Sequence, residues 1–257
     1  MIAAAAVKID NDALIVPSLS LKPQLRELRQ LERRGSTYTQ DAMVHTYSPF
    51  MLKIADFLLE KECTAWRRFA HGVLAEGRFC LVEQAATRDF AKRQHLRLQW
   101  TDAAVAQSIY LRLESFLPDR VDGLAPAGCA SNIRLYRYGP GHCFGKHIDE
   151  SSEVGGEGGV RGVRGVSKFT VLIYLTTSLP SGSGGGSSSI DDDDSSACTG
   201  GETVFYNDHR GRAVFASVCP VRGTLLLHGH GERCLTHEGA PVGSGSKLVL
   251  RTDVLYC

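Results

Sequence analysis

Two histidines and one aspartate are the residues of this sequence whose types and spacing best suit metal chemistry. His147 and Asp149 are separated by one residue, so an extended backbone would project both side chains from one face and let them reach one cation. His237 supplies a second imidazole later in the chain. Two imidazoles and one carboxylate on one face of an ion form the arrangement typical of non-haem Fe(II) sites. The sequence therefore predicts that His147, Asp149 and His237 bind a metal ion.

Two further histidines compete with His237 for the third ligand position. His228 and His230 alternate in the segment Leu-Leu-Leu-His-Gly-His, and this spacing also suits metal binding. A His-x-Asp pair is by itself a weak signal, because nine histidines in 257 residues make such pairs easy to obtain by chance. We favour His237 because two cationic residues follow it.

These cationic residues are Lys247 and Arg251, which lie on one alternating face of the segment 247–256. A cation that points into a β-barrel needs an anion, because burying an unpaired charge is costly. A dicarboxylate cosubstrate would supply that anion, which arginine would grip with two hydrogen bonds and lysine would attract as a point charge. In the alternative, one of the two residues is exposed or forms a salt bridge, for instance with Asp253.

The C-terminal half must position these residues, and its pattern has the period of β-strands. Within 132–138, Ile133 and Leu135 face one way while Tyr136 and Tyr138 face the other. Further β-rich stretches cover 166–176, 201–206, 214–217, 223–228 and 247–256. Short strands with glycine-rich turns between them predict a barrel or a jelly roll.

The segment from residue 50 to 130 has helical patterns instead. A short strand and a turn at Ala55–Asp56 precede an amphipathic helix that ends near Leu74, and a second helix is predicted over 102–116, before Pro118. Helices followed by strands indicate an α+β domain.

Residues 1–49 are assigned to an N-terminal extension. It contains a candidate strand at 13–16 and a charged amphipathic helix at 24–34, whose leucines recur at three-residue spacing. The basic face of this helix is interpreted as solvated rather than as a contact for a partner or substrate.

Two inserts, 151–165 and 181–199, interrupt the series of strands. The first is rich in glycine, valine and arginine, and the second contains a run of glycine and serine followed by four aspartates. Neither can bury enough apolar surface to fold on its own. The aspartates 191–194 lack the alternating ligands and central glycine of a calcium-binding loop. We therefore predict flexible, solvated loops.

The overall composition is that of an ordinary soluble globular protein, with 43% hydrophobic and 22% charged residues and a net charge of +1. Nothing in the charge balance favours nucleic acid as a partner. No signal peptide and no membrane span are predicted. The eight cysteines have no Cys-x-x-Cys spacing, so reduced thiols and a cytoplasmic or nuclear location are expected.

Five motifs carry a resemblance to a known family. They are NIRLYRYGPGHCFGKHID at 132–149, KFTVLIYLT at 168–176, GGETVFY at 200–206, PVRGTLLLH at 220–228, and HEGxxVxxGxK at 237–247. In this order they resemble the Fe(II)- and 2-oxoglutarate-dependent dioxygenase superfamily, and more narrowly its prolyl 4-hydroxylase-like branch. The resemblance covers residues 50–257, and its diagnostic motifs lie within 132–257.

The resemblance implies a fold and a set of roles. The fold would be a double-stranded β-helix, or jelly roll, over 131–257, supported by the helices of 50–130. His147, Asp149 and His237 match the iron ligands of the family. The remaining matches concern 2-oxoglutarate. Lys247 matches the residue that binds its distal carboxylate, and Arg251 is the alternate because Leu248 stands where the family often has tryptophan. Further contacts with 2-oxoglutarate are expected from Tyr138, Tyr174 and Thr170.

The implied activity is hydroxylation of a C–H bond with decarboxylation of 2-oxoglutarate to succinate. Fe(II), 2-oxoglutarate, O₂ and ascorbate would be required, and no side chain beyond the metal ligands would be catalytic. A protein or peptide side chain is the favoured substrate. The alternatives are a small-molecule or lipid hydroxylase, a catalytically silent interaction module of the same fold, and a cupin-like metal binder that uses His228 or His230.

Overall fold

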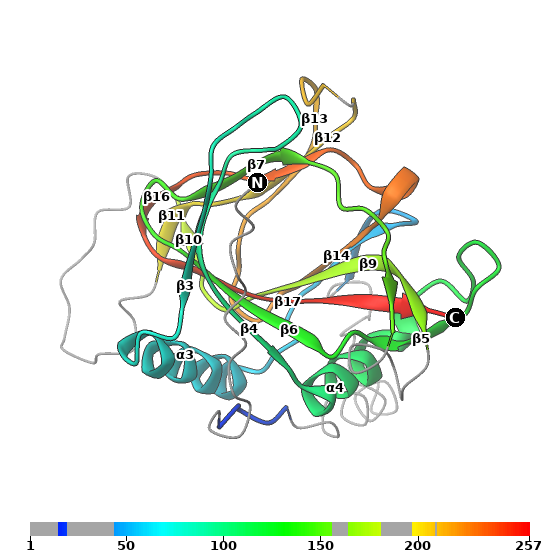
Figure 1. Ribbon diagram of the computed structural model, residues 1–257, viewed down its shortest axis with the longest axis horizontal. Coiled ribbons are helices and arrows are strands. Elements are labelled where there is room, and N and C mark those ends of the chain that lie inside the picture. The colour runs from blue at the N-terminus through cyan, green and yellow to red at the C-terminus, as the bar shows by residue number, and fades with distance from the viewer. Residues whose placement is uncertain (1–14, 20–43, 156–163, 181–196, 209) are drawn as a thin grey trace, which may run out of the picture.

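Most strands of this chain join one strongly curved sheet that closes most of the way into a barrel (Figure 1). The computed structural model describes residues 15–19, 44–155, 164–180, 197–208 and 210–257. Its elements are β1 (Val44–Ser48), β2 (Met51–Ile54), α3 (Glu60–Ala75), β3 (Cys80–Gln84), β4 (Arg93–Thr101), α4 (Ala103–Leu113), η2 (Glu114–Phe116), β5 (Pro126–Cys129), β6 (Asn132–Tyr138), β7 (Cys143–His147), β8 (Glu153–Val154), β9 (Gly165–Tyr174), β10 (Ser178–Leu179), β11 (Cys198–Gly200), β12 (Thr203–Tyr206), β13 (Val214–Val218), β14 (Leu225–Gly229), η4 (Gly231–Arg233), β15 (His237–Gly239), β16 (Val242–Gly245) and β17 (Lys247–Tyr256).

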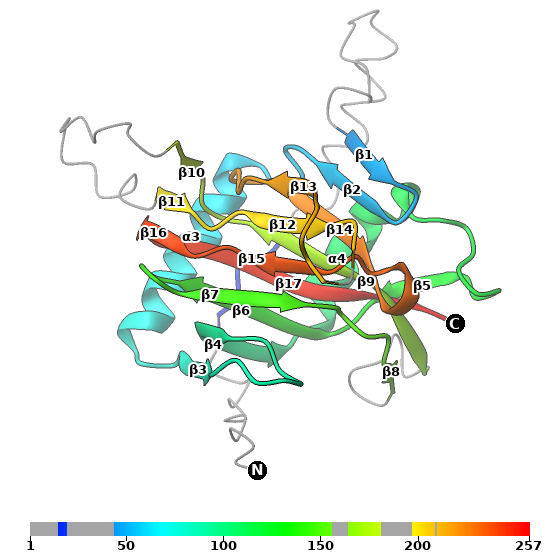
Figure 2. The ribbon, with the colours of Figure 1, turned by 90° about the horizontal axis from the view of Figure 1, so that it is seen from above.

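The barrel has two walls that face each other. The strand order in the large sheet is β1-β2-β14-β9-β17-β6-β4-β7-β15-β12-β13, so β4 joins the two walls by pairing with both β6 and β7. Figure 2 shows β7, β15 and β12 running side by side on the wall away from the helices. The short strands β10, β11 and β16 form a separate small sheet. This architecture confirms the predicted double-stranded β-helix, or jelly roll.

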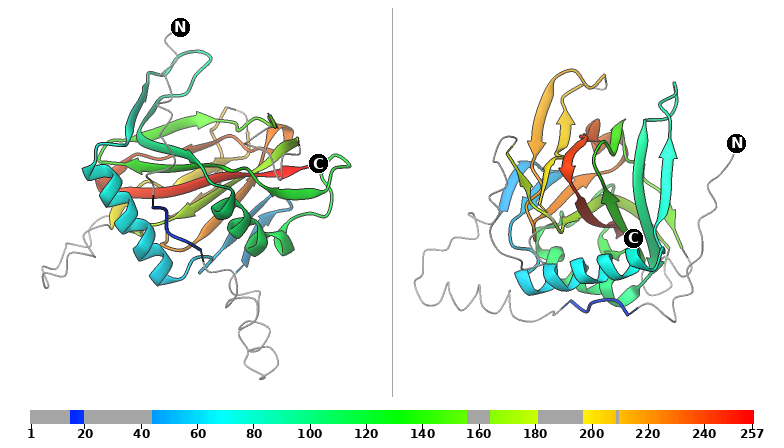
Figure 3. Two further views of the ribbon diagram at one scale, coloured as in Figure 1. Left: turned by 60° about the horizontal axis from the view of Figure 1, so that its bottom comes forward. Right: turned by 90° about the vertical axis from the view of Figure 1, so that its left-hand side faces the viewer.

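The helices α3 and α4 cover the outer face of one wall, as Figure 3 shows. Trp66 of α3 and Ile109 of α4 are fully buried in one core cluster with Ile133 and Leu135 of β6. Burying a side chain of this size stabilises the folded state by roughly 1.5–3 kcal/mol. Tyr138 belongs to a different cluster, so the predicted division of β6 into two faces is confirmed.

A buried ion pair ties the two helices together. The guanidinium of Arg112 donates to both carboxylate oxygens of Glu62, at 2.6 and 3.0 Å, and also to the carbonyl oxygen of Phe57 at 2.9 Å. Glu62 in turn accepts the backbone N–H of Leu59 at the start of α3. The N-terminus of α4 is capped by Asp102, whose carboxylate accepts the N–H of Val105 at 2.9 Å.

The predicted extension and inserts are described only in part. The candidate helix 24–34 lies outside the described residues, and residues 15 and 16 of the candidate strand form no strand. β1, which falls within the predicted extension, pairs with β2. The described ends of the inserts carry strands, because β8 pairs with β9 and β10 pairs with β11. The prediction that residues 191–194 do not form a calcium-binding loop concerns residues outside the described ranges.

All eight cysteines are free, which agrees with the predicted reduced thiols. Among the described helices, none has the length and apolar character needed to cross a bilayer.

Candidate metal centre

Strand pairing brings the two predicted histidine ligands together. In the antiparallel pair of β7 and β15, His147 lies directly opposite His237, and the centroids of their rings are 4.2 Å apart. β12 extends the same wall and places Phe205 opposite His237, with the two rings stacked at 5.3 Å between centroids. The sheet register therefore fixes both imidazoles at one height in the barrel.

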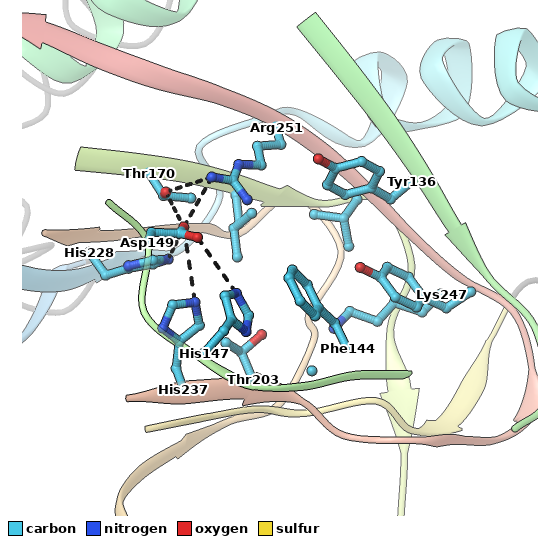
Figure 4. Close-up of a pocket in the computed structure, with 14 residues that line it drawn as sticks. Tyr136, Phe144, His147, Asp149, Thr170, Thr203, His228, His237, Lys247 and Arg251 are labelled. Carbon is cyan, nitrogen blue, oxygen red and sulfur yellow. Dashed lines mark hydrogen bonds and ion pairs between the residues drawn. The ribbon is translucent and has the colours of Figure 1, made fainter. Parts of the chain in front are cut away.

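Asp149 follows β7 and turns back toward these histidines. Its backbone is held by the turn around η4, because its N–H donates to Cys234 Sγ at 3.2 Å and its carbonyl oxygen accepts the N–H of Gly231 at 2.8 Å. One ligand atom each from His147, Asp149 and His237 lies within 4.8 Å of the other two (Figure 4). The structure thus brings the three predicted ligands to one point.

The tautomers of both histidines suit a metal ion. His147 Nδ1 lies 2.8 Å from the carbonyl oxygen of Gly145, and His237 Nδ1 lies 3.0 Å from that of Leu235. A carbonyl oxygen can only accept, so Nδ1 of each ring carries the proton. The unprotonated Nε2 atoms face the Asp149 carboxylate, at 3.6 Å for His147 and 4.0 Å for His237. A backbone carbonyl that orients the ring in this way is usual for metal-binding histidines.

The protonation states also suit a cation. Burial lowers the pKa of His147 to about 3 and lowers that of His237, so both rings are neutral near pH 7. Burial alone would raise the pKa of Asp149, but the positive charge of Arg251 and the neighbouring histidines hold it well below its usual range. Two neutral imidazoles and one ionised carboxylate fit Fe(II), which this donor set selects.

A second group of possible ligands shares His237. It consists of His228, Cys234 and His237, all of them buried. His228 Nε2 lies 3.8 Å from Asp149 Oδ2 and has no hydrogen-bond partner among the described residues. Burial raises the pKa of Cys234 to about 12, which disfavours the thiolate that a metal requires. The carboxylate-containing group is therefore the better candidate, although no pattern in the sequence marks Cys234.

A pocket of about 430 Å³ opens beside the three candidate ligands. Lys247 lines it on the side away from them in Figure 4. His228, the predicted competitor, also lines the pocket, and the further lining residues that were not predicted as site residues are Tyr136, Phe144, Leu172, Thr203, Gly239 and Val249.

Phe144 covers one face of a candidate ligand. Its ring stacks on His147 with 3.6 Å between centroids and 11° between planes, and the guanidinium carbon of Arg93 lies 3.9 Å from the same ring. No signal in the sequence marks Phe144, because its role depends on the pairing of β7 with β15 and β4.

Lys247 is a buried cation that has no carboxylate partner among the described residues. Only 4% of the residue is exposed. Its ammonium donates to the carbonyl oxygen of Gly201 at 2.6 Å and lies 5.4 and 5.5 Å from the ring centroids of Tyr138 and Tyr174. Burial lowers its pKa to about 8. No ion pair with Lys247 occurs within the described residues, so an anionic ligand would relieve the cost of burying this charge.

Arg251 has carboxylate partners already. Its guanidinium lies 3.0 Å from Asp149 and 3.4 Å from Asp253, and these charges raise its pKa above the usual value despite burial. Thr170 is also next to Asp149, to which its hydroxyl donates at 2.6 Å. The hydroxyl of Tyr174 instead pairs with Thr203 at 2.7 Å. Of the five predicted 2-oxoglutarate contacts, the structure thus places Tyr138 and Tyr174 beside Lys247, and Arg251 and Thr170 around Asp149.

His230, the other predicted competitor, is engaged elsewhere. Its Nε2 lies 2.7 Å from the hydroxyl of Thr170 and its Nδ1 lies 3.2 Å from that of Ser167. Both ring nitrogens therefore have partners, which leaves none for a metal ion.

Comparison with known proteins gives matches in structure but not in sequence. No family model matches the chain, and the search of curated proteins found no match. A prolyl hydroxylase from Trichoplax adhaerens, solved with a peptide fragment of the oxygen degradation domain of hypoxia inducible factor, has a TM-score of 0.54 at 17% identity, covering 91% of this chain and 94% of its own.

Two other solved structures have TM-scores of 0.50. The viral collagen prolyl hydroxylase of Paramecium bursaria Chlorella virus-1, in complex with 2-oxoglutarate, is 19% identical and covers 81% of this chain and 97% of its own. The non-haem α-ketoglutarate-dependent carbocyclase SnoK from nogalamycin biosynthesis is 13% identical and covers 85% of this chain and 84% of its own. This chain therefore has the jelly-roll fold of the prolyl hydroxylases and other 2-oxoglutarate-dependent oxygenases.

Proposed function

We propose that this chain is a non-haem Fe(II)- and 2-oxoglutarate-dependent dioxygenase of the prolyl 4-hydroxylase-like branch. One observation carries the proposal. Two imidazoles and a carboxylate converge at one end of a pocket, and the same pocket is lined by a buried lysine that forms no ion pair with any described residue. A metal ion would satisfy the first group and a dicarboxylate cosubstrate would satisfy the second.

Each residue would have a separate role in this site. His147 and His237 would offer Nε2 to the metal, and Asp149 would offer a carboxylate oxygen. Lys247 would bind the distal carboxylate of 2-oxoglutarate beside the ring of Tyr138. Bound iron with 2-oxoglutarate and O₂ would supply the oxidation of a C–H bond, with succinate and CO₂ as coproducts, and ascorbate would keep the iron reduced.

Phe144 and the neighbouring walls would exclude water from this chemistry. The ring of Phe144 stacks on His147, so it would shield one face of that ligand and fix the plane of its imidazole. His237 is shielded by Phe205 in the same way. No side chain is required to transfer a proton, because these side chains would bind and orient the metal and cosubstrate and exclude water from the site.

We infer that Lys247 rather than Arg251 anchors the cosubstrate. Within the described ranges, Lys247 has a carbonyl oxygen as its only hydrogen-bond acceptor, whereas Arg251 is already neutralised by Asp149 and Asp253. Recruiting Arg251 would break two existing ion pairs, while recruiting Lys247 would break none. Within this proposal, residues 50–257 form the catalytic domain and residues 1–49 an extension.

A protein or peptide side chain is the proposed substrate. Support comes from the Trichoplax prolyl hydroxylase, which shares the fold and was solved with a peptide fragment. A small-molecule hydroxylase is the second candidate, since the carbocyclase SnoK has the same fold. A catalytically silent module is the third.

The test is succinate formation by purified protein with Fe(II), 2-oxoglutarate and ascorbate, using peptides, small molecules and cell extract as substrates. We expect turnover in the wild type and in His71→Ala, which changes an exposed histidine of α3, but none in His147→Ala. Equal turnover in wild type and His147→Ala would refute the enzyme proposal. Iron content separates the metal sites: His228→Ala should retain iron, whereas a cupin-like site would lose it.

A further inference from the structure

We propose that Thr170 and Arg251 are positioning residues that hold the Asp149 carboxylate in one orientation, so that Oδ2 accepts their hydrogen bonds and Oδ1 is left for the metal ion. The inference rests on the proposed function, because it assigns Asp149 to the metal. Both contacts reach the same oxygen: the Thr170 hydroxyl lies 2.6 Å and the Arg251 Nη2 atom 3.0 Å from Asp149 Oδ2. Asp149 Oδ1 lies 3.6 Å from His147 Nε2, and Oδ2 lies 4.0 Å from His237 Nε2.

The hydrogen-bond partners of Thr170 fix the direction in which its hydroxyl donates. Its hydroxyl lies near Asp149 Oδ2, His230 Nε2 at 2.7 Å and Arg251 Nη2 at 3.2 Å. An ionised carboxylate can only accept and a guanidinium can only donate, so the single Thr170 proton points at Asp149. His230 must then donate its Nε2 proton to Thr170.

The same reasoning extends the network to Ser152, the residue before β8. With its proton on Nε2, His230 accepts at Nδ1 from the hydroxyl of Ser167, 3.2 Å away. Ser167 also accepts the backbone N–H of Ser152 at 3.0 Å. Ser167 Oγ also lies 3.2 Å from Ser152 Oγ. From His230 through Thr170 the donors point toward Asp149, so a change in the carboxylate orientation would leave Thr170 without an acceptor for its proton.

Arg251 is fixed independently of Asp149. It sits on β17, whose pairing with β9 places Asp253 opposite Thr170, and its guanidinium also contacts Asp253 at 3.4 Å. The side chains of Arg251, Asp149 and Asp253 are 10–14% exposed. Hydrogen bonds to charged groups in such a site are stronger than in water. Arg251 therefore acts as a rigid donor rather than as a mobile surface cation.

This arrangement has a consequence for metal binding. A carboxylate free to rotate could present either oxygen, both oxygens or neither to the ion, whereas two donors on Oδ2 select one geometry before the metal arrives. Partners that orient metal ligands commonly contribute 10- to 100-fold to metal affinity. The predicted effect is therefore on the dissociation constant of the metal itself.

The test is Mn²⁺ binding to the full-length protein, measured by calorimetry without cosubstrate. Thr170→Val keeps the shape of the side chain but removes the hydroxyl, and we expect it to weaken Mn²⁺ binding about 10-fold. Thr170→Ser restores the donor and should bind within about 2-fold of wild type. Arg251→Met should weaken binding by about 10- to 100-fold. Arg134→Met is the matched control, because Arg134 contacts Asp253 but not Asp149.

Equal Mn²⁺ affinity in wild type, Thr170→Ser and Thr170→Val would overturn the inference. If a thermal melt shows that Arg251→Met is unfolded, the comparison of Thr170→Val with Thr170→Ser still tests the positioning role. A general loss of packing would weaken Mn²⁺ binding in Arg134→Met as well, and that result would also count against a positioning role. Failure of the proposed function is distinct: it would appear as a wild type that binds Mn²⁺ but forms no succinate.

Discussion

Replacing Lys247 with methionine should make the metal-free protein more stable while removing its affinity for 2-oxoglutarate. Burial lowers the pKa of Lys247 from its usual 10.5 to about 8. Each pKa unit corresponds to about 1.4 kcal/mol, so holding this charge inside the folded chain costs roughly 3 kcal/mol at pH 7. Methionine removes that cost but also removes the hydrogen bond to the carbonyl oxygen of Gly201, a loss of about 1 kcal/mol.

The net gain in the free energy of unfolding is therefore about 2 kcal/mol at pH 7, or a rise in Tm of about 4–8 °C for a domain of this size. The gain in stability of Lys247→Met over wild type should vanish at high pH. Because the pKa of Lys247 is lower in the folded state, the unfolded chain binds more protons between pH 8 and 10.5, so wild-type stability rises with pH through this window. Above it, the variant should be slightly less stable than the wild type.

The assay is thermal unfolding of wild type and Lys247→Met at pH 7 and above pH 10, with and without 2-oxoglutarate. Cosubstrate at 100 times its Kd should stabilise the wild type by about 2.7 kcal/mol and leave the variant unchanged. Lys61→Met, at an exposed position of α3, controls for the general effect of the substitution. A variant that is less stable than wild type at pH 7, or that still binds 2-oxoglutarate with wild-type affinity, would refute the reasoning.

Two further predictions concern the helices and the ligands. Glu62→Gln should destabilise the protein by about 3–5 kcal/mol in urea denaturation, because it replaces the carboxylate that neutralises the buried charge of Arg112 with a neutral amide; a loss below 1 kcal/mol would show that the pair is dispensable. Mn²⁺ affinity should fall far less between pH 7.5 and 5.5 than the roughly 100-fold expected of two imidazoles of ordinary pKa, because burial lowers the pKa values of His147 and His237. A steep fall in affinity over this range would contradict the assignment of these neutral rings as ligands.

The sequence predicted those parts of the fold whose pattern is local. The observed bounds of β17 are the predicted ones, because two short apolar runs that follow glycine-rich turn residues mark a buried strand by themselves. α3 and α4 were likewise visible from their apolar faces. β4 was missed because its buried residues, His95, Leu98 and Trp100, do not alternate regularly along the strand.

The candidate site was predictable in its residues but not in its contacts. His147, Asp149 and His237 followed from residue type and from the resemblance, yet their meeting depends on the register of β7 with β15, a strand of three residues that carries no pattern. The choice between Lys247 and Arg251 also lay beyond the sequence. It depends on which cation already has a carboxylate next to it, and Asp149 reaches Arg251 only in the folded barrel.

The position of β17 has a consequence for how the chain acquires its fold. Of all the strands described, β17 comes last in sequence, yet it lies between β9 and β6 in the sheet. During synthesis, β9 and β6 each keep one edge unpaired until β17 has been made, and unpaired strand edges can associate with other chains. Pairings of this long range also close slowly. The nascent barrel should therefore depend on chaperones until its late strand inserts and completes the wall.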